Sequence, residues 1–423
     1  MTFEGEPEVE VEKLVPGGDG FARLPSGEFL FVKGGVPGDR IRVRSVEKQR
    51  GALCTTDYEL VAPSADRVVP ECPIASACGG CDAMHLARGA ELRHKASVLG
   101  EALSRVGGLQ VQAPPLVEGA LAQGYRARVR FHVGREGKLG FFARGTHQLV
   151  EVPGCAVADP RINEALARIR RLARRFPEAL TGFSDVELRA TEQGVVARFV
   201  PRDGIKPIAA EPLLRALTKQ MPAAATEREA AALVERRSLG DVYVDIPADA
   251  FSQINPEVNR LLVSSVVTGA KQRGLSTFCD LFAGVGNFAL PLAHAGLSGV
   301  MVERTPSAVR AAERAAGEQG LPQLRARTVD ASRALKDLVH EGRQFDLVVL
   351  DPPREGAPDV VAGIAALRPR AVAYVACDPV TLSRDLRPLL AAGLRLASVE
   401  AFDMFPRTHH FETLVWLDAV PAS

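Results

Sequence analysis

From about Asp245 to its end, the chain alternates apolar strand-like runs with Ala- and Leu-rich helical stretches. The strand-like runs read TFCDLF, GVMVE, FDLVVLD, AVAYVAC and TLVWL. Strands that alternate with helices are typical of a parallel sheet in which each helix connects one strand to the next. Residues 245–423 are therefore predicted to form a Rossmann-like, doubly wound α/β domain.

Two further domains are predicted before that point, because 423 residues exceed what one ordinary core holds. Residues 1–63 contain short β-rich runs separated by turn signals such as Pro-Gly-Gly-Asp-Gly, which are typical of a small OB-like β-barrel. Residues 64–244 combine strand-like, arginine-rich stretches with helical stretches at 85–106 and 161–175. They are predicted to form a central α+β domain.

The charge balance excludes a strong overall attraction for polyanions. Lys and Arg number 52 against 51 Asp and Glu, a net charge of +1, so any nucleic-acid surface has to be local. No apolar stretch reaches the about 18 residues of a membrane-spanning helix, and the acidic start MTFEGEPEVEVEK lacks the features of a signal peptide. We expect a cytoplasmic protein without membrane contact, and the sequence indicates no obligate protein partner.

A glycine turn follows the first strand-like run of the C-terminal domain. The sequence DLFAGVGNF (280–288) passes from a β run into a helix, and glycines at such a turn let a ligand approach the backbone. Glu303 follows the next strand-like run, where an acidic side chain can accept hydrogen bonds from ribose hydroxyls. The pattern predicts an adenosine-containing cofactor, and on this evidence a nicotinamide dinucleotide fits as well.

Acidic residues recur at later strand ends. Asp330 follows LRARTV and Asp351 follows FDLVVL, at the edge where open α/β sheets bind their ligands. Asp330 is also a good candidate for the N-cap of the next helix. Two prolines after Asp351 indicate a rigid loop beside the cofactor pocket.

The run AVAYVA ends in Cys377-Asp-Pro, which predicts a thiol at the same edge. A thiolate at this edge could add covalently to a substrate and activate it. Such a reaction also needs a general base that removes a proton. Glu412 is the candidate base, and His409 or His410 could take this role instead. Cys279, inside TFCDLF, is interpreted as a core residue.

Three of the seven cysteines form a cluster, Cys72-x5-Cys78-x2-Cys81. Seven cysteines are too few for a disulfide scaffold in a chain of this length. A dense group of thiols in a reducing compartment indicates a metal site instead.

Together these motifs resemble the RNA 5-methyluridine methyltransferase family, in particular the branch with an N-terminal TRAM domain and an iron–sulfur cluster that modifies 23S ribosomal RNA. The resemblance runs nearly end to end. The matching motifs are FVKGGVPGD (31–39), the cysteine cluster, FSQIN (251–255), DLFAGVGNF, DPPR (351–354), CDP (377–379) and DMFPRTHHFE (403–412).

The resemblance implies an RNA-binding TRAM barrel for residues 1–63, an iron–sulfur and RNA-binding domain for 64–244, and a class I S-adenosylmethionine-dependent methyltransferase domain for 245–423. It also implies that helix 85–106 packs on the catalytic domain. Cys377 would be the nucleophile and Glu412 the base. The positions that match the family's cofactor contacts are Gln253, Phe282, Gly284, Gly286, Asn287, Glu303, Asp330 and Asp351, although relatives often have Asn at the position of Asp330.

The resemblance further implies one [4Fe-4S] cluster on Cys72, Cys78, Cys81 and Cys155. Without it, four thiolates would suggest zinc first, and the spacing does not distinguish the two metals. In either case the metal would tie residues 72–81 to Cys155 and support the fold without a redox step.

RNA is the implied substrate, and the TRAM-bearing branch favours 23S ribosomal RNA over transfer RNA. The basic stretches 40–50, 126–130 and 168–175 could contact phosphates or be ordinary solvated surfaces. The target uridine is expected to flip out of its stack into the pocket. Three alternatives are methylation of a base amino group, a nicotinamide-dependent oxidoreductase, and a non-catalytic RNA-binding protein stabilised by metal.

Overall fold

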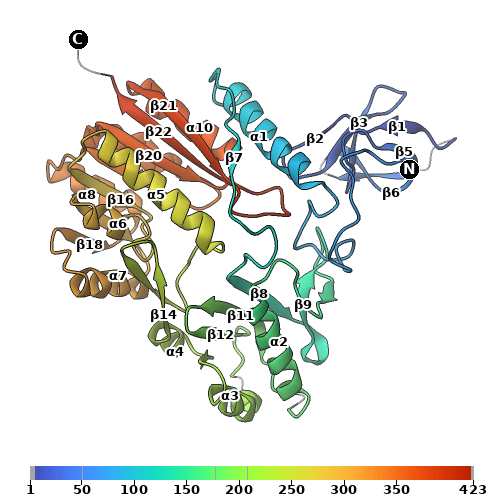
Figure 1. Cartoon of the computed structure of the whole chain (residues 1–423), viewed down its shortest axis with the longest axis horizontal. Coiled ribbons are helices and arrows are strands. Elements are labelled where there is room, and N and C mark those ends of the chain that lie inside the picture. The colour runs from blue at the N-terminus through green and yellow to red at the C-terminus, as the bar shows by residue number, and fades with distance from the viewer. Residues whose placement is uncertain (1–4, 50, 177, 207, 421–423) are drawn as a thin grey trace.

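The computed structural model describes residues 5–49, 51–176, 178–206 and 208–420. The chain forms three regions, each built on its own large β-sheet (Figure 1). In the described part of the chain, no helix combines the length and apolar character that a membrane crossing requires.

The C-terminal region is an eight-stranded sheet with the order β18-β17-β16-β19-β20-β22-β21-β7. Its catalytic-domain strands are β16 (Thr277–Leu281), β17 (Ser298–Glu303), β18 (Leu324–Thr328), β19 (Leu347–Leu350), β20 (Ala371–Ala376), β21 (Leu394–Phe402) and β22 (Glu412–Ala419). The first five strands in the order are parallel, as predicted. The last run, TLVWL, instead forms an antiparallel hairpin with β21, because the nine residues between β21 and β22 contain no crossover helix.

Helices cover both faces of this sheet. Along β19, Leu347 and Val349 share one core with α5, α6 and α7, whereas Val348 and Leu350 share the other with α8, α9 and α10. Strands buried on both faces read as continuous apolar runs, which explains the sequence pattern. The helices are α5 (Pro256–Gln272), α6 (Ala289–His294), α7 (Pro306–Glu318), α8 (Ala331–His340), α9 (Pro358–Ile364) and α10 (Pro379–Ala391), with a 3-10 turn at Ala365–Leu367.

The N-terminal region is a six-stranded sheet around its own core of Val11, Leu30, Val32, Ile41 and Val43. The strands are β1 (Glu8–Glu10), β2 (Lys13–Leu14), β3 (Gly20–Arg23), β4 (Phe29–Val32), β5 (Arg40–Gln49) and β6 (Ala52–Ala62), in the order β1-β5-β6-β4-β3-β2. Within the described residues the strand pairing leaves β1 and β2 at the two edges, so a closed barrel stays a prediction.

The central region is a second six-stranded sheet, β10-β9-β8-β11-β12-β13, whose core also includes residues of α2 and α3. The hairpin of β14 and β15 connects it to the catalytic sheet. The elements are β8 (Arg128–Val133), β9 (Leu139–Phe142), β10 (Leu149–Glu151), α2 (Pro160–Ala173), β11 (Phe183–Thr191), β12 (Gly194–Pro201), α3 (Glu211–Thr218), β13 (Ala223–Ala224), α4 (Glu227–Ala232), β14 (Val234–Ser238) and β15 (Tyr243–Pro247), with 3-10 turns at Arg135–Gly137 and Ile208–Ala210.

Two elements from the segment between the N-terminal and central sheets pack on the catalytic sheet. The short strand β7 (Leu116–Val117) pairs with β21 at the sheet edge. The helix α1 (Arg88–Arg105) contributes Val98, Leu99 and Leu103 to the core that contains α10. Figure 1 shows α1 between the N-terminal sheet and the catalytic sheet, so this helix connects the two regions.

Candidate active site

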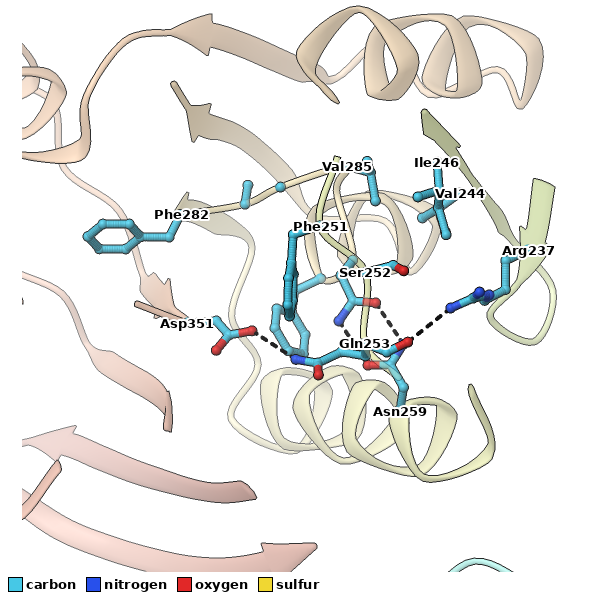
Figure 2. Close-up of a pocket in the computed structure, with 14 residues that line it drawn as sticks. Arg237, Val244, Ile246, Phe251, Ser252, Gln253, Asn259, Phe282, Val285 and Asp351 are labelled. Atoms are coloured by element: carbon cyan, nitrogen blue, oxygen red, sulfur yellow. Dashed lines mark hydrogen bonds between the residues drawn. The ribbon is translucent and has the colours of Figure 1, made fainter. Parts of the chain in front are cut away.

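A pocket lies where β16 and β19 end (Figure 2). The pocket, together with its mouth that opens to solvent, holds about 470 Å³ of space free of protein atoms. Its lining includes Arg237, Phe251, Ser252, Gln253, Asn259, Phe282, Gly284, Val285, Asn287 and Asp351.

The backbone turn after β16 forms one wall of this pocket. Phe282, Gly284 and Gly286 have φ angles of 64°, 54° and 85°. Positive φ is unfavourable for a bulky side chain such as that of Phe282, and backbone strain of this kind is common at ligand-binding sites. A Cβ atom added at Gly284 would meet no protein atom within 4 Å. The glycine therefore leaves open space for a ligand beside the backbone.

Gln253 and Asp351 approach each other across the pocket (Figure 2). Gln253 Nε2 donates to Asp351 Oδ2 at 3.4 Å, while the backbone oxygen of Gln253 accepts from Arg237 Nη1 at 3.0 Å. Burial raises the pKa of Asp351 to about 7, and the hydrogen bond from Gln253 opposes that rise. Arg237 belongs to β14, so the central region holds one side of the pocket and the catalytic sheet holds the other.

Two other predicted cofactor residues already have protein partners. Glu303 accepts hydrogen bonds from the backbone N–H groups of Gly284, at 3.1 Å, and Thr305, at 2.8 Å. Asn287 exchanges two amide hydrogen bonds with Asn259, at 2.8 and 3.0 Å. Glu303 thereby fixes the glycine turn, and Asn259 fixes the orientation of the Asn287 amide.

Asp330 and Gly286 lie outside the described residues that line the pocket. Asp330 is exposed and caps α8 by accepting from Ser332 N at 2.9 Å, which is the alternative role that the sequence indicated for it. A Cβ atom at Gly286 would come within 3.1 Å of the Leu290 side chain. Gly286 therefore allows the turn to pack against α6.

Cys377 follows β20 at the same sheet edge and lines a second pocket of about 660 Å³. Burial raises the pKa of its thiol to about 12, and the carboxyl groups of Glu412 and Asp351 act in the same direction. Arg354 is the nearby cation that opposes this rise. Other residues of this pocket come from the N-terminal sheet, α1 and the loops, namely Pro16, Gly17, His94, Val98, Asp378, Pro379, Val380, His409, His410 and Phe411.

Glu412 is the first residue of β22, and only 3% of its surface is exposed. Its Oε2 has no hydrogen-bond partner among the described residues. Burial raises the pKa of Glu412 well above its ordinary value, and Asp351 adds to the shift. A buried carboxyl without a partner is costly and is a mark of functional sites. Asp351, Cys377 and Glu412 thus form one electrostatically coupled group.

The two histidines before Glu412 differ in their surroundings. Asp82 binds both the ring Nδ1 of His409 and its backbone N–H, the latter at 2.8 Å. His410 lines the pocket of Cys377, and burial lowers its pKa to about 4. His409 is therefore engaged by Asp82, whereas Glu412 and His410 are the alternatives that the geometry leaves for a base.

Cys72, Cys78, Cys81 and Cys155 line one cavity, which has mostly apolar walls. Burial raises the pKa of Cys78 and of Cys155, and raises that of Cys81 to about 12. Asn163 of α2 fixes Cys155 by accepting from its N–H at 2.8 Å and donating to its oxygen at 3.0 Å. No three described His, Cys, Asp or Glu side chains are grouped closely enough to hold a metal ion.

Several pocket residues were missed by the sequence reasoning. Arg237 pairs with Glu235, and a second buried pair, Glu187 and Arg189, lies on β11. Arg189 donates to the oxygen of Ala250 at 2.6 Å, so the two arginines fix the backbone on either side of Phe251. A Glu-x-Arg pattern within a strand was the available signal, because its two charged side chains lie on the same face of the strand and need partners where that face is buried.

Comparisons with known proteins identify close relatives along the chain. The sequence model of the family described as "tRNA (Uracil-5-)-methyltransferase" matches residues 233–420. The 23S rRNA (uracil(1939)-C(5))-methyltransferase RlmD of Chromohalobacter salexigens is 34% identical over 97% of this chain and 88% of its own length. The enzyme of the same name from Alkalilimnicola ehrlichii is 32% identical over 91% of this chain and 90% of its own.

A solved structure has the same fold over nearly the whole chain. The tRNA (uracil-54, C5)-methyltransferase of Pyrococcus abyssi, in complex with S-adenosyl-L-homocysteine, superposes with a TM-score of 0.73. The match covers 97% of this chain and 100% of that one, at 23% sequence identity. The multidomain α/β architecture is therefore shared.

Proposed function

The chain belongs to the RNA (uracil-5-)-methyltransferase family, and from this premise we propose that it methylates carbon 5 of a uridine in 23S ribosomal RNA, with S-adenosylmethionine as donor. The observation that carries the proposal is the place of three side chains beside the pocket of the glycine turn. Asp351 and Cys377 follow the neighbouring parallel strands β19 and β20, and Glu412 begins β22, which pairs with β20 at Ala376 and Thr413. Relatives named for 23S rRNA support that substrate over transfer RNA.

Cys377 is the proposed nucleophile. Its thiolate adds to carbon 6 of the flipped uracil, and the electron pair of the C5–C6 double bond moves towards carbon 5 and the carbonyl oxygen at carbon 4. S-adenosylmethionine, held in the glycine-turn pocket, would supply the methyl group that carbon 5 accepts and would leave as the neutral thioether S-adenosylhomocysteine. Arg354 opposes the burial that raises the pKa of the Cys377 thiol.

Glu412 is the proposed base. It takes the proton from the methylated carbon 5, the C5–C6 double bond re-forms, and the bond between carbon 6 and Cys377 breaks. His410 is the weaker alternative, because its lowered pKa makes it a poor proton acceptor. The Glu412 carboxyl has to lose its own proton first, since burial favours its neutral form.

The proposed cofactor residues are Gln253, Phe282, Gly284, Gly286, Asn287, Glu303, Asp330 and Asp351. Gln253, Phe282, Gly284, Asn287 and Asp351 line the pocket directly. Glu303 supports the turn through Gly284 N. The direct role proposed for Asp330 has the least support, because its carboxylate already caps α8.

Gly284→Val is expected to weaken S-adenosylmethionine binding at least about tenfold, because the added side chain enters the open space of the pocket. Gly296→Val is the matched control, since Gly296 also has positive φ and open space at its Cβ but lies outside the pocket lining. Isothermal titration of both variants checks this. Equal losses in the two would attribute the effect to backbone strain and contradict the pocket assignment.

Among the basic stretches, residues 126–130 have the strongest case for RNA contact. Arg128 and Arg130 form no salt bridge with any described residue, and Arg128 stacks on Phe251, whose ring is 60% exposed, at the mouth of the pocket. The arginines at 40–44 are paired with Glu8 and Glu59 instead, and Arg50 lies outside the described residues. An unpaired arginine beside an exposed aromatic ring suits a single-stranded nucleic acid.

Incubation of the protein with S-adenosylmethionine and 23S rRNA lacking this modification tests the proposal. Mass spectrometry should detect 5-methyluridine at one position, and a deletion strain should lack it there. A methyl group on a base amino nitrogen, or modification of transfer RNA alone, would contradict the proposal. Binding of NAD in place of S-adenosylmethionine would favour the oxidoreductase alternative.

We also propose a [4Fe-4S] cluster on Cys72, Cys78, Cys81 and Cys155. Four thiols and Arg126 line one mostly apolar cavity, and this lining fits a group that is held by four thiolate ligands. A single tetrahedral zinc also takes four thiolates, so metal analysis of the purified protein is the measurement that distinguishes the two. The cluster would tie residues 72–81 to Cys155 and supply stability.

Cys155→Ser should lower the bound iron and the visible absorption of the purified protein, with a loss of stability of about 2 kcal/mol or more, because metal-binding energy is also folding energy. Iron analysis and thermal unfolding check this. Cys54→Ser is the control, because Cys54 is a buried thiol of the N-terminal sheet outside the cavity. Zinc in the wild-type protein together with no iron would rule out the cluster.

A further inference from the structure

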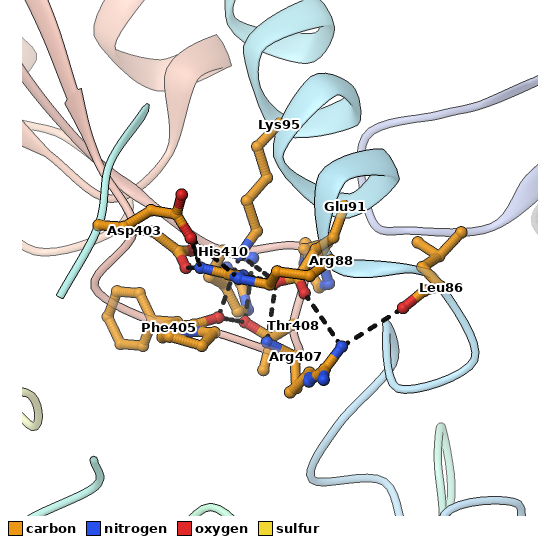
Figure 3. A network of polar contacts seen from close by, with 12 residues as sticks. Leu86, Arg88, Glu91, Lys95, Asp403, Phe405, Arg407, Thr408 and His410 are labelled. Atoms are coloured by element: carbon orange, nitrogen blue, oxygen red, sulfur yellow. Dashed lines mark hydrogen bonds and ion pairs between the residues drawn. The ribbon is translucent and has the colours of Figure 1, made fainter. Parts of the chain in front are cut away.

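Lys95 of α1 is fully buried, and no step of the proposed reaction uses it. Its Nζ donates to Glu91 Oε1 at 2.7 Å, to Asp403 Oδ1 at 2.6 Å and to the backbone oxygen of Phe405 at 3.2 Å (Figure 3). These three bonds use all the hydrogens of the ammonium group. A buried charge is costly unless paired in this way, so the contacts fix Lys95 and its partners relative to one another.

Two of these partners belong to the loop of residues 403–411, which connects β21 to β22. Lys95 contacts the loop at its first residue, through the Asp403 carboxylate, and at its third, through the Phe405 carbonyl. Arg88, one helical turn before Glu91 in α1, also pairs with Asp403. The start of the loop is therefore attached to α1 rather than to the catalytic sheet alone.

The middle of the loop is attached to the same part of the molecule. Glu91 Oε1, which accepts from Lys95, also accepts from the backbone N–H of Arg407 at 2.8 Å. Arg407 has a φ angle of 66°, which is unfavourable for a side chain of its size. The contact with Glu91 helps to hold this strained position, and Lys95 holds Glu91 (Figure 3).

The far end of the loop carries the proposed base. Glu412 follows directly, and its Oε2 has no hydrogen-bond partner among the described residues. Because no hydrogen bond holds this oxygen, the position of the carboxyl depends on the path of the backbone. Glu412 also pairs with Phe402 across the hairpin, next to Asp403. The network thus holds the loop at Asp403, next to the strand residue that pairs with Glu412, and again at Arg407. These two attachments help to set the position of the Glu412 carboxyl.

We infer that Lys95 is a positioning residue for Glu412, acting through Asp403, Phe405 and Glu91. The inference rests on the proposed function, because it assigns Lys95 to the proton-removal step of that reaction. Loss of Lys95 leaves Arg88 as the one cation among the described residues that pairs with both buried carboxylates, Glu91 and Asp403, so the loop relaxes and the carboxyl of Glu412 moves. Cys377 follows β20 and is not part of this loop, although His409, His410 and Phe411 of the loop line the same pocket. We therefore expect the addition of its thiolate to carbon 6 of the uracil to depend much less on Lys95 than the proton removal by Glu412 does.

Lys95→Met separates this role from a general structural one. RNA containing 5-fluorouridine at the target accumulates the methylated covalent adduct, because fluorine blocks proton removal, whereas uridine RNA requires the base for turnover. We expect uridine turnover to fall at least about tenfold, while the rate of adduct formation stays within about twofold of wild type. S-adenosylmethionine binding should be unchanged, which shows that the catalytic domain is folded.

Lys13→Met is the matched control. Lys13 also pairs with an acid of α1, Glu101 at 3.1 Å, but that pair is partly exposed and lies away from the loop. Both assays should give wild-type rates for this variant. Asp403→Asn removes the charge of the loop residue that pairs with Lys95 and preserves side-chain volume. This variant tests the inference even if Lys95→Met folds poorly.

Parallel losses of turnover and adduct formation in these variants would overturn the inference, and so would unchanged turnover. If instead the proposed function is wrong, the wild-type protein itself will form no adduct with 5-fluorouridine RNA. A decrease confined to turnover, shared by Lys95→Met, Asp403→Asn and a Glu412 variant, is the result that supports a positioning role.

Discussion

Cys377→Ala is expected to abolish the covalent adduct with 5-fluorouridine RNA and to lower methylation of uridine RNA by at least about 10⁴-fold. Carbon 5 of uracil is too weak a nucleophile without addition of the thiolate at carbon 6, so no other side chain in the pocket can compensate. Gel analysis of the adduct and transfer of a labelled methyl group measure the two effects. S-adenosylmethionine should still bind, because Cys377 does not line the glycine-turn pocket.

Cys54→Ala is the matched control, because it removes a buried thiol of the N-terminal sheet and should retain both activities. The pH dependence of the wild-type protein provides a second test. Below a pKa of about 12, each pH unit raises the thiolate fraction of Cys377 about tenfold. The kcat/KM for adduct formation, which reports on the free enzyme, should therefore rise between about pH 7 and about pH 9. A persistent adduct in Cys377→Ala would assign the nucleophile elsewhere.

Glu412→Gln is expected to slow turnover on uridine RNA by about 10² to 10⁴-fold, the usual contribution of a general base. Addition of Cys377 and methyl transfer precede the step that needs the base, so the variant should accumulate the methylated adduct even on ordinary uridine RNA. Quenched reactions separated on a denaturing gel detect this species. Unchanged turnover would transfer the base role to His410.

The same variant should not lose stability. Burial raises the pKa of Glu412, so the folded state binds the proton more tightly than the unfolded state does. The stabilising contribution of the protonated carboxyl is present below the unfolded pKa and is lost as pH rises through the folded pKa. The neutral glutamine avoids that loss, so thermal unfolding at neutral to alkaline pH should show equal or higher stability than wild type. Glu400→Gln is the control for turnover, because Glu400 is a half-buried carboxylate of β21 that accepts from Ser265 Oγ at 2.6 Å.

Much of the catalytic domain could be predicted because its strands obey local rules. Residues 347–350 are buried on both faces and read as an uninterrupted apolar run. Asp351, Cys377 and the glycine turn could be located at one sheet edge, since each directly follows a strand of the parallel sheet. The hairpin of β21 and β22 could not be derived from periodicity, because direction depends on the connection rather than on the strand.

Contacts between residues far apart in the sequence could not be predicted. A helical stretch at 85–106 was predicted, yet the face that α1 buries includes the charged residues Glu91 and Lys95. A charged residue in a helical pattern reads as solvent-exposed until its partner is known, and the partner of Lys95, Asp403, lies 308 positions away. Arg237, which holds Gln253, was missed for the same reason.

The residues of the proposed chemistry could be predicted from the sequence, because a thiol, a carboxyl and a glycine turn are recognisable by residue type and by their place next to strands. The contacts that hold these groups became visible in the structure. The burial that raises the pKa of Cys377 and Glu412, and the network through which α1 holds the loop before the base, depend on residues that meet only in the folded chain. Desolvation and charge pairing are properties of the packed interior, so no local pattern encodes them.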